Sequence, residues 1–360
     1  MPKEARKKRY EWLDVLKFMG MLEIYIAHMG TVSGKLLPLM FIFNVQLFFF
    51  MSGLFYRPPQ KGQLRGYLVD KVCGILVPYF LFSFIIMGLS FIRHDFELSK
   101  FKDYANFIFI GRRNATAGSA LWFLNCYFVV VVLYTLVMVL VRNKYLALLV
   151  SFALFEVQYP LLGLLHLNSE AVIFNFDSAI GYLVFFSIGH CSADLFKREW
   201  DFKNAQGKGV ILLRAAALAM LALVYFKGDT YLTEKLPVLE FARIGEFLQI
   251  LLLIEANVFL AKCLTWVPYI QQLGRDSLIL CGCEDSTRVL VNDFISIFGL
   301  SIVIQTPLAS VLCALLYLVV CGKIYGTLAR KYFPILAGKW RPGQPVLQRK
   351  NDTAHRFTEI

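Results

Sequence analysis

The stretch ALWFLNCYFVVVVLYTLVMVLV, from Ala120 to Val141, contains 22 residues and no charged side chain. A helix needs about 20 mostly apolar residues to cross the hydrocarbon core of a bilayer. Nine further blocks are of similar character: 11–30, 36–56, 72–92, 145–166, 178–194, 209–227, 244–264, 276–298 and 302–324. The sequence therefore predicts an all-α, polytopic transmembrane helical bundle of about ten transmembrane helices.

The composition agrees with a membrane protein, because 58% of the 360 residues are hydrophobic and the mean hydropathy is +0.60. The first block is long, contains charges and lacks a small-residue cleavage motif, so we do not interpret it as a signal peptide. Connecting loops are short. We expect a basic N-terminus over 1–10, one membrane domain over 11–326 and a basic C-terminal tail over 327–360.

The net charge of +12 is distributed unevenly between the two predicted sides. With the N-terminus inside, 24 of the 37 Lys and Arg residues fall on the inner side and nine on the outer side. This asymmetry follows the positive-inside rule, which places both termini in the cytoplasm. The excess charge thus reflects topology, and we expect no nucleic-acid partner. The eight cysteines lie in or beside the blocks, where Cys acts mostly as a small hydrophobe, so we predict neither a disulfide nor a metal site.

Ionisable side chains interrupt the first block, in LKFMGMLEIYIAH (Leu16–His28). Such residues are costly in lipid and mark functional sites. Lys17 and His28 are eleven residues apart, which places them on one helix face about 16 Å apart along the axis. Asp14 lies three residues before Lys17 and can pair with it. Glu23 falls on another face. The alternative is that Lys17 reaches the inner interface and His28 only marks the outer boundary.

Polar groups in the next two blocks have both structural and functional interpretations. Ser52 and Gly53 suit close packing of small residues between helices. A basic turn precedes the third block and includes Arg65 and Lys71. Its cations orient the protein, or they bind phosphate through charge-assisted hydrogen bonds.

Late in the chain, GRDSLILCGCEDSTRVLVND (274–293) carries further charges. Glu284 and Arg288 are four residues apart and can form an ion pair within the helix. The alternative is that both line a cavity near the middle of the membrane. Asp285 points to another face.

The order of these motifs resembles that of the acyltransferase-3 family of integral membrane O-acyltransferases, especially the branch similar to fucose 4-O-acetylases. The matching motifs are YEWLDVLKFMGMLEIYIAH (10–28), FFFMSGLF (48–55), VPYF (77–80), LWFLNCYF (121–128) and LGRDSL (273–278). The family pattern of a basic residue, ten residues and a His matches Lys17 and His28. Its earlier acid matches Asp14, and its WFL motif matches Trp122 and the two residues that follow.

The resemblance implies transfer of an acyl group, usually acetyl, from acyl-CoA to a sugar hydroxyl of a surface or secreted glycan. It also implies a multi-pass protein of the plasma membrane, the inner membrane in bacteria. Three positions depart from the family pattern. Gln46 stands where the family often has Pro, shortly before the aromatic run of the second block. Gly74 stands where a second basic residue often follows Lys71, and Glu284 stands where a His often follows the late GxxSL motif.

Acyl transfer needs a base, and the pKa of His lies near neutrality, so we expect His28 to be the general base. We expect Lys17, held by Asp14, together with Arg65 and Lys71, to bind acetyl-CoA or another acyl-CoA. Trp122, Ser52, Glu284 and Arg288 are the candidate acceptor-binding residues. We expect membrane lipid and a glycan as partners and leave open a homodimer. A transporter of a glycan or small polar solute is the alternative function, although we find no internal repeat. A membrane sensor or structural domain is a third.

Overall fold

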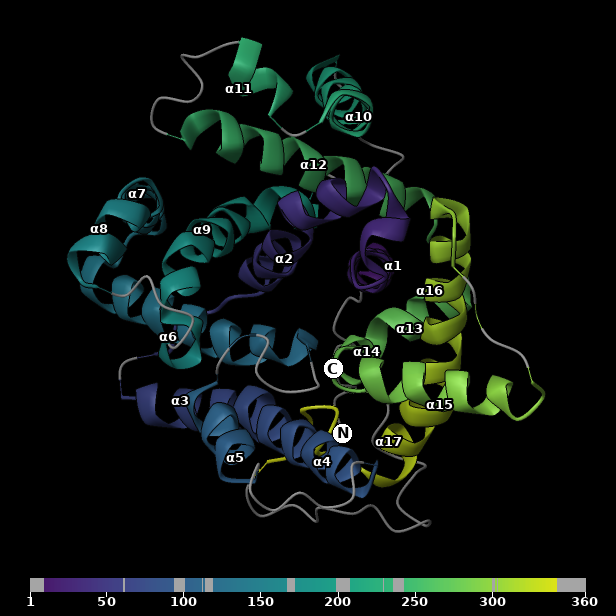
Figure 1. Cartoon of the computed structure of the whole chain (residues 1–360). Coiled ribbons are helices and arrows are strands. Elements are labelled where there is room, and N and C mark those ends of the chain that lie inside the picture. The colour runs from purple at the N-terminus through teal and green to yellow at the C-terminus, as the bar shows by residue number, and fades with distance from the viewer. Residues whose placement is uncertain are drawn as a thin grey trace, which may run out of the picture.

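The computed structural model describes residues 10–60, 62–93, 101–111, 113, 119–166, 172–198, 208–228, 230–235, 243–299, 302 and 304–341. The predicted N-terminus (1–10), apart from its last residue, and the end of the predicted tail, from 342 onward, lie outside the described residues. Every regular element in the described ranges is helical, which confirms the all-α prediction (Figure 1).

The helices are as follows: α1 (Glu11–Ala27), η1 (Gly30–Ser33), α2 (Leu36–Leu54), α3 (Leu64–Lys71), η2 (Val72–Leu76), α4 (Val77–Arg93), α5 (Phe101–Ile110), η4 (Ser119–Leu121), α6 (Trp122–Val141), α7 (Lys144–Glu156), α8 (Gln158–Leu164), η5 (Ile173–Asn175), α9 (Phe176–Arg198), α10 (Lys208–Lys227), α11 (Tyr231–Lys235), α12 (Ile244–Cys263), α13 (Pro268–Arg275), α14 (Ser277–Gly282), α15 (Glu284–Ser296), α16 (Pro307–Cys321), η8 (Gly322–Gly326) and α17 (Thr327–Tyr332).

Seven helical segments are long and apolar enough to cross a membrane, and α7 with α8 forms an eighth if this pair, bent by 62°, is one span. The two predicted blocks that fall short are 11–30 and 276–298. The first forms α1, which has only 17 residues and includes four charged side chains. The second breaks at Cys283 into the short helices α14 and α15. Both exceptions involve the ionisable residues that the sequence singles out.

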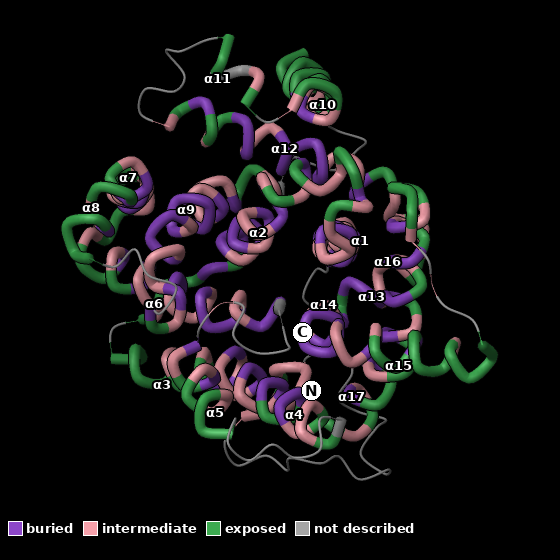
Figure 2. Tube along the Cα trace, in the orientation of Figure 1, coloured by how far each residue is buried: buried purple, intermediate pink, exposed green. Residues whose placement is uncertain are grey.

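Buried residues concentrate on α1, α2, α9 and α14, whereas α10 is largely exposed (Figure 2). The crossing of α2 and α9 depends on two glycines. A Cβ atom on Gly53 would lie 2.0 Å from the carbonyl oxygen of Phe186, and one on Gly189 would lie 2.2 Å from that of Phe50. Small residues let helix backbones approach this closely in membranes. The structure thus supports the packing interpretation of Gly53.

Contacts between distant segments connect the predicted inner parts of the chain with each other. The pairs are Tyr10 with Phe55, Trp12 with Phe196, Lys144 with Asp194, Asp14 with Arg275 and Asp70 with Arg341. Predicted outer segments also meet, since Lys35 donates to the carbonyl of Phe226 and Arg113 donates to Ser178. The bundle therefore has two ends that match the alternation expected from the charges.

Candidate active site

Helix α1 is fixed against the late helices along its length. Near its start, a Cβ atom on Gly274 of α13 would overlap the carbonyl oxygen of Asp14, so only glycine permits this approach. Near its end, the hydroxyl of Tyr25 donates to the carbonyl of Leu280 in α14 at 2.8 Å. These contacts determine where His28, the residue that follows the helix, meets the rest of the bundle.

The break between α14 and α15 presents Glu284 to that position. Gly282 packs against the ring of Phe82 so closely that a Cβ atom would lie 2.5 Å from it. Cys283 separates the two helices, and Glu284 is the first residue of α15. A carboxylate in the first turn of a helix is stabilised by the helix dipole. The break in the predicted span thus places the buried carboxylate of Glu284 in the interior of the bundle.

His28 and Glu284 form a hydrogen-bonded pair. Nδ1 of His28 lies 2.7 Å from Oε1 of Glu284, across 256 residues of sequence. The Glu284 side chain is only 1% exposed, whereas His28 is 22% exposed. Oε2 of Glu284 has no hydrogen-bond partner, and Nε2 of His28 has none in the part of the chain that the structure describes.

This geometry prepares His28 for proton transfer. An ionised carboxylate only accepts hydrogen bonds, so Nδ1 of the imidazole is the donor. The lone pair of a neutral ring then lies on Nε2, which is free to accept a proton. The carboxylate also stabilises the imidazolium that forms when the proton arrives. The sequence predicted a base at His28 but named no carboxylate to orient it.

The ion pair between Glu284 and Arg288, one of the two interpretations of their spacing, does not form. Glu284 turns toward His28, and the guanidinium of Arg288 lies 3.8 Å from the carboxylate of Asp285 instead. The first turn of α15 thus separates its two acids, one into the pair with His28 and one toward Arg288. Whether Arg288 binds a substrate stays a prediction.

Asp14 and Lys17 occupy the opposite end of α1. Asp14 is buried, and its carboxylate lies 3.8 Å from the guanidinium of Arg275. The pairing of Asp14 with Lys17 stays a prediction. Lys17 is partly exposed. The helix is continuous from Glu11 to Ala27, so the predicted separation of Lys17 and His28 along one face holds.

Trp122 begins α6 near the same end of the bundle as His28. Ala120, two residues before Trp122, contacts α14, because the thiol of Cys281 lies 3.6 Å from its carbonyl oxygen. The guanidinium of Arg113 stacks 4.1 Å from the centre of the Trp122 ring and donates to Ser178, while its buried Nε has no partner among the described residues. The sequence analysis missed Arg113, whose only signal was its place shortly before the WFL motif.

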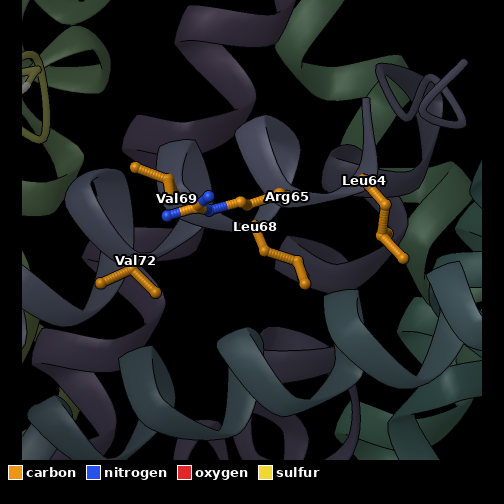
Figure 3. A pocket seen from close by; sticks show the side chains of 5 residues that line it. All are labelled: Leu64, Arg65, Leu68, Val69 and Val72. Atoms are coloured by element: carbon orange, nitrogen blue, oxygen red, sulfur yellow. The ribbon is translucent and has the colours of Figure 1, made fainter. Parts of the chain in front are cut away.

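Two other predicted residues have different surroundings. The hydroxyl of Ser52 donates to the carbonyl of Phe48 at 2.8 Å within its own helix. Arg65 lies in a shallow surface pocket with Leu64, Leu68, Val69 and Val72, and its guanidinium points toward Val69 (Figure 3).

Lys71 projects about 120° from Arg65 around α3, so the structure does not join the two into one cluster. The ammonium of Lys71 lies 5.1 Å from the centre of the Tyr67 ring. Arg341, from the C-terminal segment, contacts the residue before Lys71: its Nε lies 3.0 Å from Oδ1 of Asp70. Sequence reasoning missed Arg341, which it treated only as part of a basic tail.

Comparison with known proteins gives a family but no individual relative. No curated protein and no solved structure matches this chain. The family described as Acyltransferase domain, Acyl_transf_3, matches residues 10–326, which include His28, Lys17, Trp122 and Glu284. The match covers most of the chain and both members of the hydrogen-bonded pair. The chain therefore belongs to the acyltransferase-3 family and has the membrane domain of an O-acyltransferase.

Proposed function

We propose that this protein transfers an acetyl group from acetyl-CoA to a hydroxyl group of a sugar in a surface or secreted glycan. The pairing of His28 with Glu284 carries the proposal, because it supplies an oriented base in a site that is largely shielded from water. Family membership favours transfer over the transporter alternative. The resemblance to fucose 4-O-acetylases supports a sugar as the acceptor.

The two ends of α1 have different proposed roles, with His28 at the reacting end and Lys17 at the end that binds the donor phosphates. Nε2 of His28 accepts the proton of the acceptor hydroxyl as its oxygen attacks the thioester carbonyl. Collapse of the tetrahedral intermediate breaks the carbon–sulfur bond, and the imidazolium returns the proton to the CoA thiolate. Glu284 remains ionised and holds the ring throughout. Lys17, positioned by Asp14, and Lys71 attract the donor phosphates at the other end.

The acceptor is proposed to bind near Trp122. An aromatic ring with a stacked guanidinium offers an apolar surface and hydrogen-bond donors, a combination that suits a sugar. Arg113 adds to this surface a buried Nε that no described residue engages. Arg288 and Ser52 are also proposed to contact the acceptor.

We further propose about ten membrane crossings, with α1 and the α14–α15 pair completing the set and both termini in the cytoplasm. The Lys and Arg asymmetry supports this orientation. So does the meeting of predicted inner segments at one end of the bundle. In a bacterium the protein would lie in the inner membrane, with the donor supplied from the cytoplasm.

The decisive test is glycan acetylation in cells that lack the chromosomal gene and carry either the wild-type or the His28→Ala protein. We expect mass spectrometry to detect acetylated surface glycan only with the wild type, at equal membrane abundance of both proteins. Undiminished acetylation with His28→Ala would refute the assignment of the base. Identical glycans with and without the wild-type gene would refute the function.

A further inference from the structure

The C-terminal segment after α17 folds back onto the start of the third predicted span. Gly338 has a φ of +68°, and a Cβ atom on it would lie 2.6 Å from the carbonyl oxygen of Gly74. Glycine at position 338 therefore permits a backbone contact that a larger residue would prevent, whereas a Cβ atom on Gly74 would lie at an ordinary 3.7 Å from the carbonyl oxygen of Gly338. The segment covers the position where the sequence lacks a second basic residue, and it brings Arg341 to the same place.

Arg341 and Lys71 form a site with unused hydrogen-bond donors. Arg341 bonds Asp70 through Nε and the carbonyls of Gly338 and Trp340 through Nη1. In the part of the chain that is described, its Nη2 has no partner, and the ammonium of Lys71 donates no hydrogen bond. The side chain of Arg341 is 41% exposed and so remains open to a ligand.

The charges of this cluster do not balance. Arg341 contacts Asp70, which directly precedes Lys71 in the chain, and among the described residues Asp70 is the carboxylate in ion-pair contact with this cluster. Two like charges held together destabilise each other unless an anion joins them. A phosphate oxygen bound by a guanidinium and an ammonium satisfies both cations.

The cluster also connects to the proposed base. A Cβ atom on Gly338 would lie 3.2 Å from the side chain of Leu278 in α14. Leu278 belongs to α14, and Glu284 begins α15 directly after the break at Cys283. The segment that carries Arg341 therefore packs on the helix that leads to the His28–Glu284 pair.

We propose that Arg341 and Lys71 bind a phosphate group of the acyl donor, so that the C-terminal segment forms part of the donor site. The inference rests on the proposed function for the identity of the donor. Arg341 from the end of the chain compensates for the neutral Gly74, and Asp70 positions the guanidinium.

The test compares Arg341→Ala with Lys331→Ala, an exposed cation of α17 whose loss changes the net charge equally. Kinetics are measured on purified full-length protein with acetyl-CoA and with acetyl-pantetheine, which has the same thioester but no phosphate. We expect Arg341→Ala to raise KM for acetyl-CoA about tenfold with little change in kcat, as for the loss of one charge-assisted bond. The KM for acetyl-pantetheine and the kinetics of Lys331→Ala should stay at wild-type values.

A second variant tests the role of the segment. Gly338→Ala should raise KM for acetyl-CoA in the same way, because the new methyl group displaces the backbone from Gly74. Equilibrium binding of CoA to the same proteins separates this inference from the proposed function. Wild-type protein that binds CoA through Arg341 without transferring acetyl would refute the function and leave the site standing.

Three outcomes would overturn the inference. One is an unchanged KM for acetyl-CoA in Arg341→Ala. Another is an equal rise in KM for acetyl-pantetheine, which indicates a merely structural role. The last is a loss of binding to phosphatidylglycerol vesicles with unchanged CoA binding, which assigns the cluster to lipid headgroups.

Discussion

Replacement of Glu284 by Gln isolates the contribution of the buried carboxylate. Gln has nearly the same shape, but it lacks the charge that stabilises the imidazolium of His28. The hydrogen bond of 2.7 Å involves a carboxylate with 1% exposure, so solvent compensates little for its loss. A hydrogen bond to a charged group contributes about 1.5–3 kcal/mol. If this stabilisation is realised in the transition state, kcat falls roughly 10- to 100-fold.

The matched control is Asp285→Asn. It removes one negative charge from the adjacent residue, whose partner is Arg288 at 3.8 Å. We expect its kcat to remain within about twofold of the wild type, since exposed and half-exposed ion pairs contribute little. His28→Ala should have the largest effect, about 100- to 10,000-fold, because it removes the base itself.

The assay follows release of CoA thiol from acetyl-CoA by purified protein in the presence of acceptor, with protein amounts matched by absorbance. The order of kcat values should be wild type and Asp285→Asn, then Glu284→Gln, then His28→Ala. KM for acetyl-CoA should be unchanged in Glu284→Gln. A kcat for Glu284→Gln equal to that of Asp285→Asn would refute the role assigned to the pair.

The remaining predictions concern the acceptor and the stability of the bundle. Arg113→Ala should raise KM for the acceptor several-fold while KM for acetyl-CoA stays constant. Arg113→Lys should recover only part of the loss, because an ammonium cannot stack as a planar group. Steady-state kinetics with each substrate varied in turn measures both KM values. Gly53→Ala should lower the free energy of unfolding by about 1–3 kcal/mol because its methyl group meets the backbone of α9. Gly66→Ala in α3 has open space and should leave the free energy of unfolding unchanged or raise it by up to about 1 kcal/mol, because Ala favours a helix more than Gly does. Thermal unfolding measures both. Arg330→Met removes the ion-pair partner of the buried carboxylate of Asp276, which keeps a hydrogen bond from Gln272, and should cost about 1–3 kcal/mol; an unchanged melting temperature in detergent would contradict it.

Sequence alone was sufficient for the class of fold and for one half of the site. Runs of apolar residues predict membrane helices because lipid requires length and hydropathy, and seven such helices are present. The spacing of Lys17 and His28 survives because helix geometry is local. These properties depend on neighbours in the sequence, so no tertiary information is needed.

The second half of the site depends on contacts that sequence spacing does not encode. A spacing of four residues allowed Glu284 to pair with Arg288, but Glu284 instead contacts His28, which lies 256 residues earlier in the chain. The same limit applies to Arg341, whose position depends on the fold-back contact of Gly338. Helical periodicity describes an uninterrupted helix and fails where a helix ends inside the predicted span.

The distance in sequence between His28 and Glu284 affects how the protein is made. The ribosome synthesises His28 early and Glu284 some 256 residues later, after most of the bundle has entered the membrane. Until α15 is inserted, the imidazole has no carboxylate to orient it. Under the proposed mechanism, a growing or truncated chain that lacks α15 would keep at most the residual activity predicted for Glu284→Gln. Full activity would then appear only after the late helices have entered the membrane.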